Sequence, residues 1–322
     1  MKAIVVAETG GPEKLQYMDH SDPTPGESDV VVEVESAGVN FIDTYHRSGL
    51  YDIDMPFVPG LEGAGTVVAV GSGVTDLSTG DRVAWVSGIG SYAEKVAILA
   101  ERAIPLPDAI STQTAAALLL QGLTAHYLAT DTYPLDPEST CLIHAGAGGV
   151  GHLLTQIARI KGARVVTTVG SPDKAELSKA AGAWEVILYR DVDFATEVER
   201  LVGPKGIDVV YDGVGAATFM KGLDVLRPRG LMVTFGNASG PVPEISPLLL
   251  MRKGSLFLTR PTMADYVQSR EELLDRANEL FGWIEAGDLE VKIGDEFDLE
   301  DARAAHTALE SRRTTGKVLL HP

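Results

Sequence analysis

Short runs of β-branched residues, separated by Gly, Pro and Asp, fill the first third of the chain. They lie at residues 30–34, 65–70, 81–86 and 92–98. Runs of this length and composition are typical of strands. From about residue 112 the apolar positions take on helical spacing, over 115–120 and 123–128. We therefore expect a compact, mostly antiparallel β domain followed by a connecting helix.

After Pro134 the pattern changes to strands that alternate with helical stretches. The strands are expected near 140–144, 163–169, 185–189, 207–211, 230–235 and 255–259. This alternation indicates βαβ units and a parallel sheet covered on both faces, and six strands match a doubly wound nucleotide fold. An amphipathic segment at 265–286 and a short strand at 317–320 follow. We expect the C-terminal tail to return to the first domain.

Composition narrows the class of protein. A chain of 322 residues with 45% hydrophobic content can bury two cores. Its net charge of -18 opposes binding to nucleic acid or anionic lipid, and no run approaches the roughly 20 apolar residues that span a bilayer. The N-terminus lacks the apolar stretch of a signal peptide, and the single cysteine, Cys141, is expected to be a buried thiol. We expect a cytoplasmic protein.

A glycine-rich turn follows the expected strand at 140–144. Residues 145–151, Ala-Gly-Ala-Gly-Gly-Val-Gly, contain G-x-G-x-x-G at Gly146, Gly148 and Gly151, and a helical stretch follows. Small residues let backbone amides approach a pyrophosphate, and a helix N-terminus favours negative charge. The motif is weak alone, but the preceding strand and the following helix are the context that it requires. A glycine turn without a ligand is the alternative.

The end of the second strand of this fold indicates which dinucleotide is bound. A site for NAD usually places Asp or Glu there, about 20 residues after the motif, to bind the ribose hydroxyls. Here the strand ends in Gly170-Ser171, and Pro172-Asp173-Lys174 has the pattern of a helix start. Because Ser171 and Lys174 can bind a 2'-phosphate, we expect NADPH. Alternatively, Lys174 is a solvated helix lysine.

Several further segments lie at residues 38–45, 48–51, 80–83, 122–124, 181–183, 209–215 and 230–237. Together with the glycine loop, they are spread along the chain from residue 38 to residue 237. With these segments the chain resembles the NADPH:quinone oxidoreductases of the zeta-crystallin type, within the medium-chain dehydrogenase/reductase superfamily. The motif Gly-Val-Asn-Phe-Ile-Asp at 38–43 is specific to that branch, whereas the glycine loop is shared with many dehydrogenases.

The resemblance implies an α/β protein with a GroES-like, mostly β catalytic domain, residues 1–122 and 262–322, around a Rossmann cofactor domain with a doubly wound parallel sheet, residues 123–261. It also implies a homodimer. In this scheme Lys174, Tyr189 and Arg312 would surround the 2'-phosphate, with Arg313 as an alternative to Arg312, and Phe235 would neighbour the nicotinamide. The expected NADPH site comprises Gly146 and Gly170 together with the positions at which relatives contact the cofactor: Asn40, Thr124, Gly148, Gly149, Val150, Ser171, Lys174, Tyr189, Phe235, Asn237 and Arg312.

A zinc site is not expected. Alcohol dehydrogenases of the superfamily place Cys near the position of Asn40 and His in a Gly-His-Glu motif, where this chain has Gly60-Leu61-Glu62. The single cysteine and the scattered histidines leave no metal-ligand spacing. Glu62 is therefore interpreted as a structural carboxylate.

Without a Lewis acid, hydride addition to an activated acceptor such as a quinone stays feasible, because the conjugated system takes the charge. The protein must supply proximity and hydrogen bonds to the acceptor oxygen. Asn40, Tyr45 and Tyr51 are the candidate catalytic donors, although both tyrosines can be packing residues instead. We expect an NADPH-dependent quinone reductase. The alternatives are a reductase of α,β-unsaturated ketones or aldehydes, and a non-catalytic NADPH-binding protein of crystallin-like or RNA-binding type.

Overall fold

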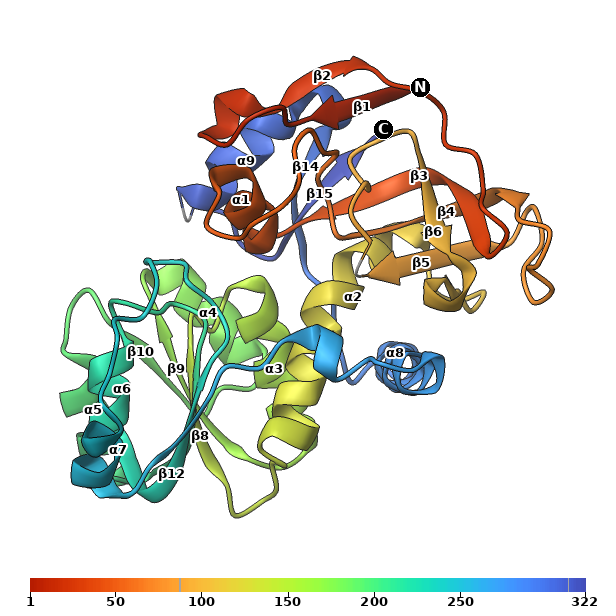
Figure 1. The fold of residues 1–322 in the computed structure, drawn as a ribbon. Coiled ribbons are helices and arrows are strands. Elements are labelled where there is room, and N and C mark those ends of the chain that lie inside the picture. The colour runs from red at the N-terminus through yellow and green to blue at the C-terminus, as the bar shows by residue number, and fades with distance from the viewer. Residues whose placement is uncertain (87, 312) are drawn as a thin grey trace. The chain divides into compact units, whose positions relative to one another are not determined.

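The computed structural model describes residues 1–86, 88–311 and 313–322 (Figure 1). The chain forms two compact units. The first comprises Met1–Leu123, Val267–Glu285 and Val291–Pro322, and the second comprises Thr124–Tyr266 and Ala286–Glu290. Residues 262–266 and 286–290, which the sequence assigns to the catalytic domain, thus group with the second unit. Helix α2, Thr112–Tyr127, runs from one unit into the other.

The first unit contains a seven-stranded sheet in the order β14-β15-β3-β4-β5-β7, with β6 also paired to β3. Its strands are β3 (Asp29–Val39), β4 (Glu62–Val70), β5 (Arg82–Val86), β6 (Lys95–Leu99), β7 (Ile104–Pro105), β14 (Ile293–Asp298) and β15 (Lys317–His321). β3 pairs antiparallel with β4, β6 and β15. The predicted antiparallel β domain is therefore confirmed, and so is the return of the C-terminal strand to it.

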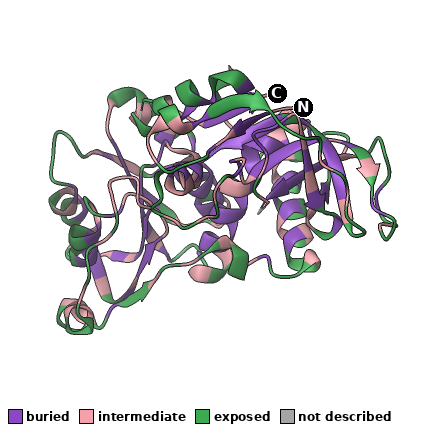
Figure 2. Ribbon diagram, turned by 45° about the horizontal axis from the view of Figure 1, so that its top comes forward, coloured by how far each residue is buried: buried purple, intermediate pink, exposed green. Residues whose placement is uncertain are grey.

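Other elements of the first unit are the hairpin β1 (Lys2–Val5) and β2 (Gln16–Asp19), and the helices α1 (Phe41–Ser48), α8 (Arg270–Glu285) and α9 (Ala302–Glu310). The core lies where β3, β5 and β15 bury Val32, Trp85 and Leu320 completely. Burial of each such side chain contributes about 1.5–3 kcal/mol. β3 is buried along most of its length because it has partners on both edges (Figure 2).

The second unit is built on a six-stranded sheet in the order β10-β9-β8-β11-β12-β13, with every neighbouring pair parallel. Its strands are β8 (Thr140–His144), β9 (Arg164–Val169), β10 (Glu185–Leu188), β11 (Ile207–Asp212), β12 (Leu226–Thr234) and β13 (Phe257–Thr259). The helices between them are α3 (Gly149–Ile160), α4 (Pro172–Ala180), α5 (Phe194–Val202), α6 (Phe219–Val225) and α7 (Pro247–Gly254). This strand order confirms the predicted doubly wound fold.

The strand order reverses between β8 and β11, and ligands of such sheets bind at the carboxyl ends of the strands at that point. The sheet is buried because its strands carry unbroken apolar runs: Cys141, Leu142 and Ile143 of β8 are fully buried. The expected burial of the Cys141 thiol is confirmed, and this burial raises its pKa to about 12. Among the described residues, none of the helices has the length and apolar character required to cross a bilayer.

Candidate functional site

The glycine loop joins β8 to α3 inside the second unit. A Cβ atom at Gly146 would lie 2.6 Å from Thr167 Cβ, and one at Gly151 would lie 2.3 Å from the Ala145 carbonyl oxygen. Both positions therefore require glycine for the turn to pack against β9 and against itself. Helix α3 begins at Gly149 with Gly148 as its N-cap, a residue that has no side chain to cap the helix. The amide groups of the first helical turn and the helix dipole suit a pyrophosphate.

The end of β9 has the helix start that the sequence predicts. Ser171 is the N-cap of α4, Pro172 takes a first-turn position and Asp173 is the first-turn acid. Lys174 follows in the same turn. Tyr189 lies directly after β10, which pairs with β9, and its hydroxyl oxygen lies 2.7 Å from the place of a Cβ on Gly170. The structure therefore brings together the expected groups of the 2'-phosphate site that belong to this unit.

The remaining cofactor candidates are spread over other parts of the chain. Phe235 follows β12, and its ring lies 2.9 Å from the place of a Cβ on Gly213. Asn237 lies on the same loop, and Thr124 is buried on α2. Arg312 lies outside the described residues. Arg313 belongs to the first unit, where its Nε donates to Ser311 Oγ over 3.1 Å.

Helix α1 and the turn that follows it position Tyr45 and Tyr51, two of the predicted catalytic residues. Its buried face holds Asp43, Thr44 and Arg47, while Tyr45 is only half-buried. Gly49 ends the helix in the left-handed conformation, with φ of 79°. The amides of both following residues then donate to the Tyr45 carbonyl. This turn brings Tyr51 back over α1, so its ring meets the Tyr45 ring edge-on with centroids 5.3 Å apart.

Asn40, directly before α1, is 4% exposed and uses both ends of its amide. Its Nδ2 donates to Glu62 Oε1 over 2.6 Å and, more weakly, to the Gly38 carbonyl over 3.4 Å. Its Oδ1 accepts from Lys317 Nζ over 2.8 Å and from Gln121 Nε2 over 3.2 Å. A Cβ on Gly38 would lie 2.4 Å from Glu62 Oε1, so this position of the motif requires glycine. The amide orientation of Asn40 is thus set by four neighbours.

Glu62 and Lys317 form an ion pair in the interior of the first unit. Their side chains are 0% and 1% exposed, and the Lys317 ammonium donates directly to Glu62 Oε1. Glu62 Oε2 accepts from the Leu120 amide over 2.7 Å. Such a pair is stable only when hydrogen bonds satisfy its remaining atoms. Glu62 therefore acts as a structural carboxylate, as its place in the sequence indicates.

A second buried chain of hydrogen bonds crosses from α9 to α1. Arg47 can only donate, so its Nη1, 2.9 Å from His306 Nδ1, makes that nitrogen an acceptor. His306 is then neutral and donates through Nε2 to the Tyr92 hydroxyl over 3.1 Å. Tyr92 in turn donates to Asp43 Oδ2 over 3.0 Å, and this oxygen also accepts from the backbone N–H of Asn40 over 2.8 Å. This chain anchors α1 from its buried side.

Burial shifts the pKa values of Asp43 and His306, two members of this hydrogen-bond chain, in opposite directions. Desolvation raises the pKa of Asp43 to about 7, against its hydrogen bonds and the charge of Lys317. Desolvation, with the nearby Arg47 charge, lowers the pKa of His306 to about 3. Asp43 Oδ1 has no hydrogen-bond partner among the described residues, so a proton on this carboxyl would lie there.

Sequence reasoning missed Lys317, Asp43, Arg47, Tyr92 and His306. The spacing of Asp43 and Arg47, four residues apart beside the Asn40 motif, is a signal for two charges on one helix face. Lys317 lies in an apolar strand far along the chain, and nothing in its local sequence indicates Glu62 as its partner.

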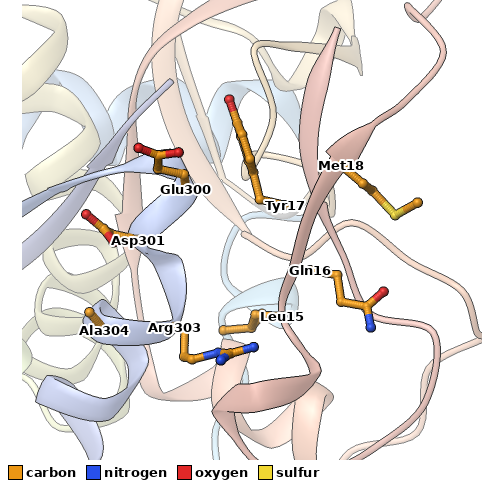
Figure 3. A pocket seen from close by; sticks show the side chains of 8 residues that line it. All are labelled: Leu15, Gln16, Tyr17, Met18, Glu300, Asp301, Arg303 and Ala304. Carbon is orange, nitrogen blue, oxygen red and sulfur yellow. The ribbon is translucent and has the colours of Figure 1, made fainter.

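One surface hollow of about 620 Å³ lies between β2 and the start of α9 (Figure 3). It is lined by Leu15, Gln16, Tyr17, Met18, Glu300, Asp301, Arg303 and Ala304. None of the predicted site residues lines it. Arg303 already donates to the Glu13 carbonyl over 3.2 Å, and the two carboxylates stand at the helix start. We therefore assign no role to this hollow.

Comparison with known proteins agrees with this geometry. Residues 26–108 match the alcohol dehydrogenase GroES-like domain, and residues 149–279 match the family described as zinc-binding dehydrogenase. A quinone oxidoreductase of Pseudomonas aeruginosa is 47% identical, with 100% of this chain and 99% of that protein covered. The chain belongs to the quinone oxidoreductase family.

Two further proteins are similar to this chain along their whole length. The crystal structure of Escherichia coli quinone oxidoreductase complexed with NADPH has a TM-score of 0.98 and 44% identity, with 100% of both chains covered. A 2-haloacrylate reductase of a Burkholderia species is 38% identical, with 99% of this chain and 98% of that protein covered. The predicted quinone oxidoreductase family and the predicted fold class are thus confirmed.

The description of one matched domain as zinc-binding does not agree with the side chains of this chain. Among the residues that the structure describes, no three His, Cys, Asp or Glu side chains gather as a possible metal site. At the positions where the zinc enzymes have Cys and His, this chain has the amide of Asn40 and the apolar Leu61. Neither is a thiolate or imidazole ligand of the kind that zinc prefers.

Loss of the Lys317 charge should destabilise the first unit. Lys317→Met leaves the Glu62 carboxylate buried without its cation, which costs about 3–5 kcal/mol in free energy of unfolding. Thermal unfolding should show a clearly lowered Tm. The double variant Glu62→Gln/Lys317→Met, which removes both charges, should recover much of it. A double variant no more stable than the single one would contradict the role of this pair.

The His306 chain should affect how stability depends on pH. The folded-state pKa of His306 lies below its ordinary value. The contribution of His306 to the free energy of unfolding therefore decreases as pH falls from about 6.5 towards 3. The folded-state pKa of Asp43 is raised, so the contribution of Asp43 to the free energy of unfolding decreases as pH rises from about 4 to 7. His306→Gln removes only the first effect, so the Tm difference between wild type and variant should shrink from pH 7 to pH 5.

The matched control for this comparison is His20→Gln, since His20 is exposed. Its Tm should follow that of the wild type at both pH values. A Tm difference for His306→Gln that stays constant between pH 5 and pH 7 would mean that His306 does not remain neutral in the folded protein.

Proposed function

We propose that this chain is an NADPH-dependent quinone reductase that works without zinc. The observation that carries the proposal is the end of β9, where Ser171 and Lys174 stand in place of an acidic residue. An acid there would bind ribose hydroxyls and repel a 2'-phosphate. The glycine loop on the neighbouring strand β8 supplies the pyrophosphate site in the same unit. Relatives at 44–47% identity carry the quinone oxidoreductase name.

Different residues bind the two phosphate-bearing parts of the cofactor. The amides at the start of α3 hold the pyrophosphate, while Ser171, Lys174 and Tyr189 hold the 2'-phosphate. When bound, NADPH supplies a hydride, and a quinone accepts the electron pair into its conjugated system. The protein's task at the acceptor is then to hold it, to exclude water and to stabilise charge on its oxygen. This task needs no metal ion.

Tyr45 and Tyr51 are the proposed donors to the acceptor oxygen, since both carry a hydroxyl and their rings meet edge-on beside α1. Asn40 is a weaker candidate. One of its amide hydrogens is held by Glu62 over 2.6 Å, and only the one towards the Gly38 carbonyl, at 3.4 Å, makes a long bond that an acceptor oxygen can replace. The single proton that completes the reduction after hydride transfer comes from a tyrosine or from water.

A second candidate function is reduction of α,β-unsaturated carbonyl compounds. The similarity to a 2-haloacrylate reductase favours it, because that name describes reduction of a conjugated acid. Both reactions use the same cofactor geometry and differ in where the hydride adds. An NADPH-binding protein without catalysis is the third possibility, and the predicted cytoplasmic location stays a prediction.

Steady-state kinetics with a panel of quinones and small alkenones should test these alternatives. We expect kcat/KM with NADPH to exceed that with NADH by at least about tenfold, which corresponds to about 1.4 kcal/mol from the 2'-phosphate contacts. Dialysis against a chelator should leave the rate unchanged. Faster turnover of alkenones than of benzoquinones would favour the second function. NADPH binding without turnover of any acceptor would contradict both enzymatic proposals.

The predicted homodimer stays a prediction, and one edge of the second unit's sheet supports it. Strand β13 ends the sheet of the second unit and, in the described chain, pairs only with β12. Four apolar side chains beside this edge are exposed: Leu248 by 57%, Met251 by 59%, Phe257 by 61% and Leu258 by 37%. An apolar edge strand left uncovered is an aggregation hazard. We propose that a second copy covers it across a two-fold axis.

Charge on this edge should prevent assembly. Phe257→Asp should turn a dimer into monomers in size-exclusion chromatography with light scattering, because a buried carboxylate opposes its copy across the axis. Val192→Asp, at an exposed apolar residue away from β13 (46% exposed), is the control and should stay dimeric. A monomeric wild-type protein would contradict the dimer, and a dimeric Phe257→Asp protein would place the interface elsewhere.

A further inference from the structure

The guanidinium group of Arg190 lies at the proposed 2'-phosphate site, although the sequence motifs do not single it out. Arg190 follows Tyr189 directly after β10, and a turn there is closed by the Asp191 amide, which donates to the Leu188 carbonyl. Its Nε lies 3.4 Å from the place of a Cβ on Gly170, next to the Tyr189 hydroxyl. Glycine at 170 thus leaves room for both groups to close over the end of β9.

Arg190 also lies close enough to Lys174 to act on its charge. Desolvation first, and then the charge of Arg190, lower the pKa of Lys174 from its ordinary value. Two cations held near each other repel, and an anion between them removes that cost. In the described chain, Arg190 is exposed and makes no ion pair with any carboxylate. Within the part of the chain that the structure describes, Arg190 is therefore an exposed cation without a carboxylate partner, beside a second cation.

These groups all belong to one compact unit. Gly170, Ser171, Lys174, Tyr189 and Arg190 lie at the ends of two paired strands, β9 and β10. Their mutual placement therefore does not depend on the first unit, which carries Arg313. A guanidinium presents a planar fork that matches phosphate oxygens with two hydrogen bonds.

We propose that Arg190, together with Lys174, binds the 2'-phosphate of NADPH and is a determinant of the preference for NADPH over NADH. This inference rests on the proposed function, since it concerns the same cofactor. A phosphate monoester is close to a dianion at pH 7, with a second pKa of about 6. Two cations and two hydroxyl groups match that charge and its three oxygens.

The test measures binding rather than turnover. Calorimetry with 2'-AMP isolates the subsite, and 5'-AMP and inorganic phosphate serve as comparison ligands. Arg190→Gln should weaken 2'-AMP and NADPH about tenfold or more and leave NADH within about twofold, because only the phosphate contact is lost. Arg190→Lys keeps the charge without the fork and should fall between. Lys174→Glu should raise the dissociation constant for NADPH far more than that for NADH.

The matched control is Arg164→Gln, which removes an equal charge at the opposite end of β9, where Arg164 lies over the Trp184 ring at 5.0 Å. It should leave 2'-AMP binding unchanged. Below pH 6 the effect of Arg190→Gln should diminish, since the phosphate gains a proton. Similar small effects of Arg190→Gln and Arg164→Gln would overturn the inference and leave the proposed function standing. A wild-type protein that binds neither dinucleotide would overturn the proposed function itself.

Discussion

The first unit depends on one buried ion pair, between Glu62 at the start of β4 and Lys317 at the start of β15. These strands come from opposite ends of the chain, and both lie beside β3. Charges taken out of water must find partners, because an unpaired one costs several kcal/mol. The hydrogen bonds that orient Asn40 therefore depend on the C-terminal strand, which carries Lys317. The ion pair links closure of the sheet to formation of the site.

The Glu62–Lys317 pair fixes the orientation of the Asn40 side-chain amide. The amide oxygen faces two donors and the amide nitrogen faces the Glu62 carboxylate, so only one amide orientation satisfies the neighbours. On the other side of α1, the chain from Arg47 through His306 and Tyr92 to Asp43 has a single direction, because Arg47 has only donors. α1 is thus held on its polar, buried face. Tyr45 and Tyr51, beside this helix, are the proposed donors to the acceptor.

In the second unit the constraint is space rather than charge. Gly146, Gly151 and Gly170 stand where a Cβ atom would meet β9, the loop backbone or Tyr189. Their lack of a side chain lets the loop pack closely at the start of α3, whose first amides suit a phosphate. The same freedom lets Arg190 approach the end of β9. The proposed anion site in this unit therefore rests on close backbone packing and two cations.

The sequence alone determined the parts that depend on local chemistry. The periodicity of apolar residues predicted all six strands of the parallel sheet. The glycine motif predicted the phosphate loop, and the capping pattern Ser171-Pro172-Asp173 predicted the start of α4. Each of these patterns acts over a few residues. The sequence also predicted a structural role for Glu62. Only the tertiary structure could show that Lys317 is its partner, that His306 is neutral, and that Arg190 stands near Lys174. Those facts depend on burial and on contacts between residues far apart in the chain, and a one-dimensional pattern carries neither.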